Sequence, residues 1–171
     1  MKYYEDTEKN WVKLMAIENI LTEVQQQILR QDGTELFERK ALEKAIDAGE
    51  KRARELNVGV TFCITDANAN PVILYHMPNA NLVSLELAPK KAWSAIAMKM
   101  PTKEISTQIQ PGAPLYEMET MLDGKLVSFA GGIPLVIKDS IVGSVGVSGG
   151  AVEEDQSICE AVVNKVLEGI N

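Results

Sequence analysis

The order of the apolar segments is the feature that most limits how this chain can fold. Two β-branched and aromatic runs, residues 58–65 and 72–76, are separated only by turn-forming residues, as in a hairpin. After a helical stretch, three more runs follow closely on one another, at residues 126–130, 133–137 and 141–147. Parallel strands need long crossover connections, which these short bends do not provide. The sequence therefore predicts an α+β fold in which helices pack on a five-stranded antiparallel sheet.

Helical periodicity marks the remaining segments of the domain. The predicted helices cover residues 35–56, 81–100, 102–110 and 153–169. Pro89 lies within the second of these, so that helix either begins near Pro89 or bends there.

A separate amphipathic helix is predicted near the N-terminus, over residues 11–30. Its apolar residues recur at spacings of three and four, and they are Leu14, Ile17, Leu21, Val24 and Ile28. Two heptads are too few for a free-standing coiled coil, so this helix is expected to dock on the domain, on a neighbouring subunit or on another protein. We divide the chain into an N-terminal helical extension, residues 1–33, and a domain, residues 34–171.

Composition and charge narrow the classes of partner. The formal net charge is −7, and nucleic acids and anionic membranes attract basic surfaces, so neither is expected to bind. Cys63 and Cys159 lie in apolar contexts without metal-ligand spacing and are expected to be reduced and buried. The polar, acidic N-terminus lacks the features of a signal peptide, so a cytoplasmic location is expected.

A glycine-rich segment, from Gly131 to Gly150, is the main candidate for a ligand site. Glycine lets the backbone approach a ligand closely. Ser148, Gly149 and Gly150 also precede a helix N-terminus, where free N–H groups favour an anion such as a carboxylate or propionate. Gly131 and Gly132 are predicted to contact the same ligand. The alternative is a bulge followed by a tight strand-to-helix turn.

His76 is the only histidine of the chain, so any site that needs an imidazole must use it. It lies at a strand end, where it could ligate haem iron or another metal. The alternative is a hydrogen-bonded histidine at the surface or in a subunit contact. No catalytic residue is predicted, because no paired carboxylates, metal triad or nucleophile elbow stands out.

Two charged clusters are interpreted more simply. Lys90 and Lys91 could pair with a ligand carboxylate, although a solvated pair is the simpler interpretation. Glu153, Glu154 and Asp155 are interpreted as charges that complement the dipole of the last helix, with a hard-metal site as the alternative.

Several short motifs occur in a fixed order between residues 34 and 168. They are Lys90-Lys91-Ala92-Trp93, Lys99-Met100-Pro101-Thr102, Gln110-Pro111-Gly112, Pro114-Leu115-Tyr116, Gly131-Gly132-Ile133-Pro134-Leu135 and Gly143-x-x-Gly146-Val147-Ser148-Gly149-Gly150-x-x-Glu153-x-Asp155. In this order they resemble the GlcG/HbpS family, and in particular the C-terminal domain of the PduO cobalamin adenosyltransferase.

The resemblance implies a profilin-like fold that assembles into dimers and larger oligomers, often octamers. It also implies binding of haem, or an accessory role near corrinoid chemistry, in the setting of glycolate or diol metabolism and bacterial microcompartments. Adenosyltransferase activity belongs to a separate N-terminal domain of PduO and is not expected from the residues that match here.

This chain departs from the family pattern along one edge of the expected site. The family's Asp-Ala-x-Gly-Asn turn appears as Asp66-Ala67-Asn68-Ala69-Asn70, and its His-Arg-Met-Asp-Gly-Ala segment appears as His76-Met77-Pro78-Asn79-Ala80. The family's Phe-Gly-Gly-Gly run is present as Phe129-Ala130-Gly131-Gly132.

Three functions follow as hypotheses. The first is a non-catalytic binder of haem or a corrinoid that uses His76 and the glycine-rich segment. The second is an enzyme or substrate-binding subunit for a small hydroxy acid or aldehyde, with Ser148, Lys90 and Tyr116 lining the site. The third is an assembly protein whose residues 11–28 dock on the shell or a lumen protein of a microcompartment.

Overall fold

The computed structural model describes residue 11, residues 14–24 and residues 34–168. The chain divides into two compact units, residues 1–35 and residues 36–171, which we describe separately. In the first unit, residues 14–24 are helical. Large apolar side chains on this helix, such as Leu14, Ile17 and Leu21, are exposed. Ile28, the last residue of the expected apolar seam, lies outside the described residues.

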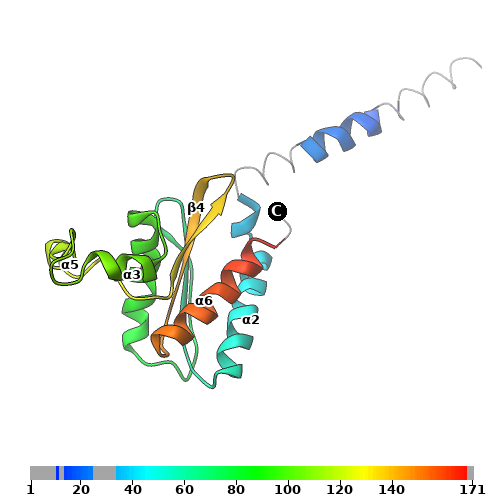
Figure 1. Cartoon of the computed structure of the whole chain (residues 1–171). Helices are drawn as coiled ribbons and strands as arrows, with labels where there is room; N and C mark the ends of the chain where they lie inside the picture. Colours follow the sequence, from blue (N-terminus) through cyan, green and yellow to red (C-terminus); the bar gives the residue numbers. More distant parts are fainter. Residues whose placement is uncertain (1–10, 12–13, 25–33, 169–171) are drawn as a thin grey trace, which may run out of the picture. The chain divides into compact units, whose positions relative to one another are not determined.

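The second unit is an α+β domain with an antiparallel sheet, as predicted (Figure 1). Its elements are η1 (Thr34–Phe37), α2 (Arg39–Glu55), β1 (Thr61–Asp66), β2 (Pro71–His76), α3 (Val83–Met98), α4 (Thr102–Ile105), η2 (Ser106–Gln108), α5 (Met118–Met121), β3 (Gly132–Ile137), β4 (Ser140–Ser148) and α6 (Val152–Val166).

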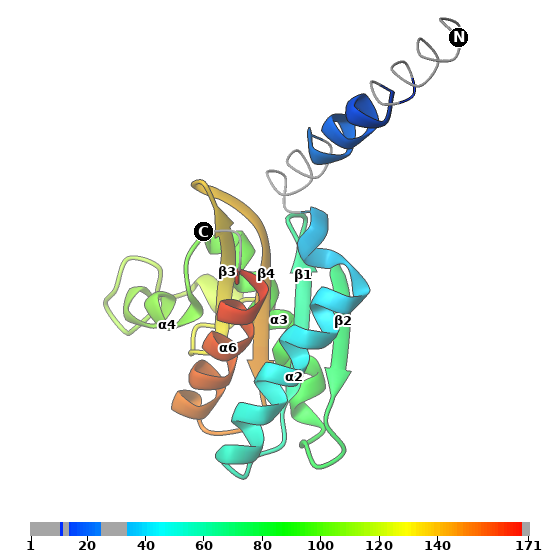
Figure 2. The same cartoon turned by 90° about the vertical axis from the view of Figure 1, so that its right-hand side faces the viewer.

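The sheet lies between two layers of helices. Its strand order is β2-β1-β4-β3, and every neighbouring pair is antiparallel. Helices α2 and α6 cover one face, and α3 covers the other (Figures 1 and 2). Strands β2 and β3 form the two edges.

The two faces of the sheet carry different side chains, as the twofold alternation of a strand requires. On β1, Phe62 and Ile64 point into the large core beneath α2 and α6. Cys63 points the other way and packs on Ala88 and Ala92 of α3. Both cysteines are buried and unpaired, as expected. Burial raises the pKa of the Cys63 thiol to about 11 and also raises that of Cys159.

Helix α3 lies almost directly on the backbone of β4. A Cβ atom at Gly146 would lie 2.1 Å from the carbonyl oxygen of Ala88 and 2.6 Å from the amide nitrogen of Ala92. The Ser144 hydroxyl donates a hydrogen bond to the Ala92 carbonyl at 2.8 Å. The small residues of this interface therefore position α3 against the sheet.

The prediction of five strands is wrong for the part of the chain that the structure describes, where the sheet has four. Residues 126–130 do not join the ladder. The Val127 N–H instead donates to the Ser94 hydroxyl on α3 at 2.8 Å, and Leu126 is buried beside Ile105 and Ile109. The segment therefore gains its burial and its hydrogen bonding from helices rather than from a neighbouring strand.

Three helix boundaries also differ from the expectation. The first helix of the domain starts as the 3-10 turn η1 before α2 begins at Arg39. Helix α3 starts at Val83 and continues through Pro89. The segment expected to be one helix over residues 102–110 is divided into α4 and η2. No helix within the described ranges is both long and apolar enough to cross a membrane.

Replacing Gly146 by alanine tests the contact between α3 and β4. The new methyl group meets backbone atoms that cannot rotate away, so we expect Gly146→Ala to lower the free energy of unfolding by about 1–3 kcal/mol. Urea denaturation measures this change. The control is Ser140→Ala at the exposed start of the same strand, which should stay within about 0.5 kcal/mol of the parent. Equal stability of the two variants would contradict the contact.

Candidate functional site

The glycine-rich segment makes its close approaches to the chain itself. A Cβ at Gly131 would lie 2.6 Å from the Val147 carbonyl oxygen and 2.9 Å from the Lys91 Nζ atom. At Gly132 it would lie 2.5 Å from the Lys91 carbonyl oxygen, and at Gly149 it would lie 2.4 Å from the Gly59 carbonyl oxygen. These glycines therefore make room for neighbouring parts of the domain.

A buried ion pair lies at the centre of these contacts. Lys91 and Asp155 are both buried, and Lys91 Nζ lies 2.7 Å from Asp155 Oδ2. Lys91 Nζ also donates to the Val147 carbonyl at 2.9 Å and lies 4.7 Å from the centre of the Phe129 ring. Burial lowers the pKa of the Lys91 ammonium and raises the pKa of the Asp155 carboxyl, and their mutual attraction opposes both shifts.

Two sequence interpretations are corrected by this pair. Lys91 is fully buried rather than solvated beside Lys90. Asp155 does more than complement a helix dipole, because its Oδ1 accepts the Gly150 N–H at 2.9 Å while its Oδ2 binds Lys91. Glu154 accepts the Ala151 N–H at 2.7 Å. Carboxylates of α6 itself therefore occupy donors at the helix start that were expected to meet a ligand.

His76 is held by a hydrogen bond at the end of β2. Its Nδ1 atom lies 2.7 Å from the Thr61 hydroxyl, and the Thr61 hydroxyl lies 2.6 Å from that of Ser84 on α3. Thr61 pairs with Ser148 across β1 and β4. We call Thr61, His76 and Ser84 the His76 cluster. Within residues 34–168, Nε2 of His76 makes no hydrogen bond, so one ring nitrogen is held and the other is available.

The surface beside His76 is apolar and open. Leu74 and His76 share the face of β2 that lies on the α3 side, because Leu74 is paired with Cys63 and the two residues are two positions apart. Val72 is 43% exposed and Leu74 is 49% exposed. Leu82 and Val83, which directly precede Ser84, are also exposed. This edge of the sheet therefore offers one imidazole within an uncovered apolar surface.

Lys90 and Tyr116 are not joined to the His76 cluster by any hydrogen bond among the described residues. Lys90 is half-buried on α3, and its carbonyl accepts a hydrogen bond from Ser94. Tyr116 is 53% exposed and lines a hollow of about 400 Å³ formed by residues 113–118 and 121. Tyr116 thus lies in an exposed hollow, whereas Ser148, which was expected to share a site with it, is buried at the end of β4.

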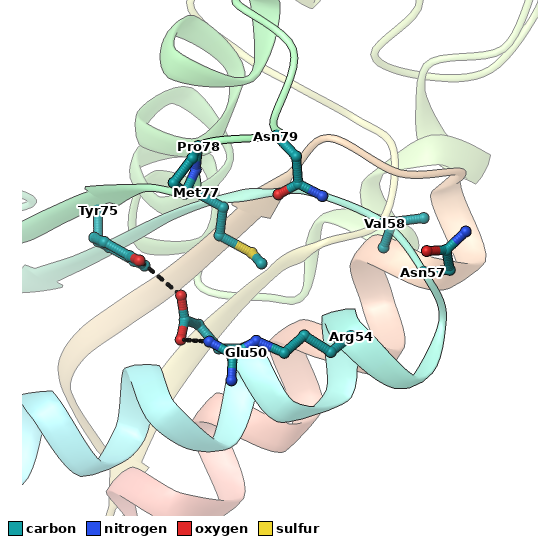
Figure 3. Close-up of a pocket in the computed structure, with 8 residues that line it drawn as sticks. All are labelled: Glu50, Arg54, Asn57, Val58, Tyr75, Met77, Pro78 and Asn79. Atoms are coloured by element: carbon teal, nitrogen blue, oxygen red, sulfur yellow. Dashed lines mark hydrogen bonds and ion pairs between the residues drawn. The ribbon is translucent and has the colours of Figure 1, made fainter.

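A larger hollow on the opposite face of β2 was missed by the sequence analysis. It has a volume of about 550 Å³ and is lined by Glu50, Arg54, Asn57, Val58, Tyr75, Met77, Pro78 and Asn79 (Figure 3). The Glu50 carboxylate accepts a hydrogen bond from the Tyr75 hydroxyl at 2.6 Å and pairs with Arg54. The hydrogen bond to Glu50 raises the pKa of Tyr75. The Glu50–Arg54 spacing of four was the available signal, but such pairs are common on exposed helices.

Comparison with known proteins places most of the domain in one family. Residues 37–164 match the family model described as "Haem degrading protein HbpS-like". The chain is 48% identical over 112 residues to the corrinoid adenosyltransferase PduO of Citrobacter freundii, covering 66% of this chain and 33% of that protein. It is 35% identical over 124 residues to a 15.0 kDa protein from the dhaT-dhaS intergenic region of the same organism, covering 72% of this chain and 87% of that protein. The chain thus spans about a third of the PduO relatives it matches.

Solved structures give the same result. A crystal structure of a PduOC–haem complex is 43% identical, with a TM-score of 0.72, and the match covers 74% of this chain and 92% of that one. The crystal structure of HbpS from Streptomyces reticuli, as a double mutant, is 25% identical with a TM-score of 0.63, covering 72% and 82% of the two chains.

Removing one partner of the buried ion pair should destabilise the domain strongly. Lys91→Met leaves the Asp155 carboxyl buried without its cation, so we expect a loss of about 3–5 kcal/mol in the free energy of unfolding. The double variant Lys91→Met/Asp155→Asn buries no charge and keeps an acceptor for the Gly150 N–H, so it should recover more than half of that loss. Chemical denaturation measures both.

The matched control is the exposed ion pair between Arg39 and Glu43 on α2. Arg39→Met should leave the stability unchanged within error, because solvent already screens that pair. A Lys91→Met variant as stable as Arg39→Met would show that the buried pair does not organise the glycine-rich segment.

Proposed function

The chain belongs to the HbpS-like family, and from that membership we propose that it is a haem-binding protein with His76 as the ligand of the iron. The observation that carries the proposal is the state of His76, whose Nδ1 is held by Thr61 while Nε2 is free of partners within residues 34–168. Imidazole ligands of metals commonly have their second nitrogen fixed in this way. The PduOC–haem structure, at 43% identity, supports haem as the bound molecule.

The surroundings of His76 fit the chemistry of haem. A porphyrin supplies four nitrogen ligands to its iron, so one protein imidazole is a sufficient axial ligand. The macrocycle is largely apolar, so it also binds more tightly where it can pack against apolar side chains and be removed from water. Leu74 provides such surface on the same face of β2 as His76, and Val72 nearby on the same strand is also exposed. We keep Lys90 and Tyr116 as proposed contacts for the propionates, because their side chains retain access to solvent.

Several predicted site residues act indirectly in this proposal. Gly131, Gly132 and Gly150 lie around the Lys91–Asp155 pair, and Gly149 is bonded to Asn81 beside the His76 cluster. We propose that they fix the domain behind the haem rather than contact the haem. Ser148 is buried next to Thr61, so we place it in the same supporting layer.

We propose that the His76 face is also covered by a second copy of the chain. An edge strand with exposed apolar side chains tends to associate. A homo-oligomer, from dimer to octamer, would cover Val72 and Leu74 and enclose the haem. A corrinoid is the alternative macrocycle, suggested by the PduO relatives, and its cobalt could take the same imidazole.

Titration with hemin tests the haem proposal. We expect the Soret band to shift and to saturate at one haem per site. His76→Ala should weaken binding by more than about 10-fold, since even outer-shell partners of a metal ligand contribute that much. Tyr75→Phe is the matched control, because Tyr75 lies next in β2 and points to the opposite face.

A Soret shift that survives unchanged in His76→Ala would exclude His76 as the ligand. A stable spectrum under reducing conditions is expected of a binder, whereas progressive loss of the Soret band would contradict a non-catalytic role. Cobalamin added in a parallel titration decides whether the site accepts the corrinoid instead.

The N-terminal helix suggests an additional role in assembly. Residues 14–24 present exposed apolar side chains within a unit of their own. We propose that residues 11–28 form an amphipathic helix that docks on a shell or lumen protein of a microcompartment, which would place the protein in a compartment within the cytoplasm. The PduO relatives support this setting.

Deleting residues 1–32 tests the role of the helix. The domain should keep its thermal unfolding midpoint and its capacity for hemin, because the larger unit begins at residue 36. The truncated protein should change its oligomer size or lose encapsulation, measured by light scattering and by co-purification with shells. An unfolded deletion product would show instead that the helix belongs to the core.

A further inference from the structure

The hydrogen bonds of the His76 cluster have a direction that follows from counting protons. We propose that the hydroxyls of Thr61 and Ser84 fix the tautomer of His76, so that Nδ1 carries the proton and Nε2 presents its lone pair to the surface. The consequence for haem rests on the proposed function. The tautomer itself does not, because it is a property of the protein without ligand.

The donors and acceptors can be assigned by starting from the backbone carbonyl of Asn81, because a carbonyl oxygen can only accept a hydrogen bond. The Ser84 hydroxyl lies 2.5 Å from the carbonyl oxygen of Asn81, so its single proton must lie between these two oxygens. Ser84 then has no proton left for its other contact, the 2.6 Å approach to the Thr61 hydroxyl. Thr61 must therefore be the donor in that contact.

Counting the hydroxyl proton of Thr61 in the same way decides whether Nδ1 of His76 donates or accepts. The only hydroxyl proton of Thr61 is directed to Ser84, so Thr61 can only accept from Nδ1 of His76 at 2.7 Å. If Nδ1 lacked a proton, two lone pairs would face each other at that distance. Thr61 and Ser84 are both fully buried, so water does not compete for these hydroxyls.

The starting carbonyl is itself held in place. The side-chain oxygen of Asn81 accepts the Ser84 N–H at 3.0 Å, and the Asn81 amide donates to the Gly149 carbonyl at 2.9 Å. This pattern also fixes the orientation of the Asn81 amide, since its oxygen and nitrogen have different partners. The glycine turn after β4 is thereby connected to His76 through Asn81, Ser84 and Thr61.

The outcome is an imidazole prepared to bind a metal before any metal arrives. A neutral histidine binds through the nitrogen that lacks the proton, and a partner that accepts from the other nitrogen increases the basicity of the ligand. Thr61 and Ser84 are positioning residues in this account, since neither would touch the iron.

Nitrogen-15 NMR of the protein without haem tests the tautomer directly. The chain has one histidine, so uniform labelling of histidine gives a single imidazole to observe. In neutral imidazole the protonated and unprotonated nitrogens have well-separated shifts. We expect the Nδ1–H form to dominate in the parent protein at a pH where imidazole is neutral. A dominant Nε2–H form would overturn the proposal.

Three variants separate positioning from general damage. Ser84→Ala frees the Thr61 proton, so the two tautomers should become mixed. Thr61→Val removes the acceptor and should also shift the population towards Nε2–H, whereas Thr61→Ser should restore the parent spectrum. Thr65→Val is the matched control, because Thr65 is a second buried β1 threonine whose hydroxyl bonds Ser144 instead. A spectrum of Ser84→Ala identical to that of the parent would contradict the proposal that these hydroxyls fix the tautomer.

A second measurement connects the tautomer to haem. Thr61→Val should weaken hemin binding by about 10-fold or more and raise the reduction potential of the bound haem, while Thr61→Ser and Thr65→Val should not. If hemin fails to bind the parent through His76, the proposed function fails and the NMR result still decides the tautomer. If hemin binds through His76 and the NMR shows Nε2–H without haem, the proposed function stands and only the proposed tautomer is wrong.

Discussion

The buried pair of Lys91 and Asp155 is the interaction on which the rest of the domain depends. It joins α3 to α6 across the end of β4, at the point where Gly131 and Gly132 leave room for Lys91. Two ions are costly to remove from water, and this cost is offset only where further hydrogen bonds satisfy both groups. Here the Val147 carbonyl and the Gly150 N–H supply them. Gly131, Gly132 and Gly150 therefore lie around the ion pair, whereas Gly146 makes room for the backbone of α3 and Gly149 for the Gly59 carbonyl.

The edge strand β2 shows how one short segment can present two unlike surfaces. Alternation directs Tyr75 and Met77 to the hollow shared with α2 (Figure 3). It directs Leu74 and His76 to the open face on the side of α3. Helix α3 contacts β2 far less than it contacts β4, so Leu74 keeps much of its exposure. A ligand or a second subunit can therefore reach His76 without any rearrangement of the core.

The sequence carries much of the fold because its signals are local. Turn residues at 66–71 and the β-branched and aromatic residues of the flanking runs are sufficient to predict the β1–β2 hairpin. The ordered motifs are sufficient to identify the family, a resemblance that the comparisons confirm. Residues 126–130 show the limit of that approach. Their composition suits a strand, but their partner is the Ser94 hydroxyl on α3, which is distant in sequence. The burial of Lys91 could not be predicted for the same reason. Lys90 and Lys91 are adjacent and identical in type, yet Lys90 is half-buried and Lys91 is buried.

The site is harder to predict than the fold for a related reason. His76 could be singled out by being unique, but its surroundings depend on Thr61, Ser84 and Asn81, none of which forms a motif with it. These residues are linked by which group donates and which accepts each hydrogen bond, and not by a sequence pattern of residue types. A buried hydroxyl has one proton to give, so a fixed carbonyl at one end of a chain of hydroxyls determines the state of the imidazole at the other. The departures from the family pattern at residues 77–80 do not interrupt this chain, because every member of it lies outside that segment. The arrangement of the His76 imidazole is therefore set by residues outside the segment in which this chain departs from the family pattern.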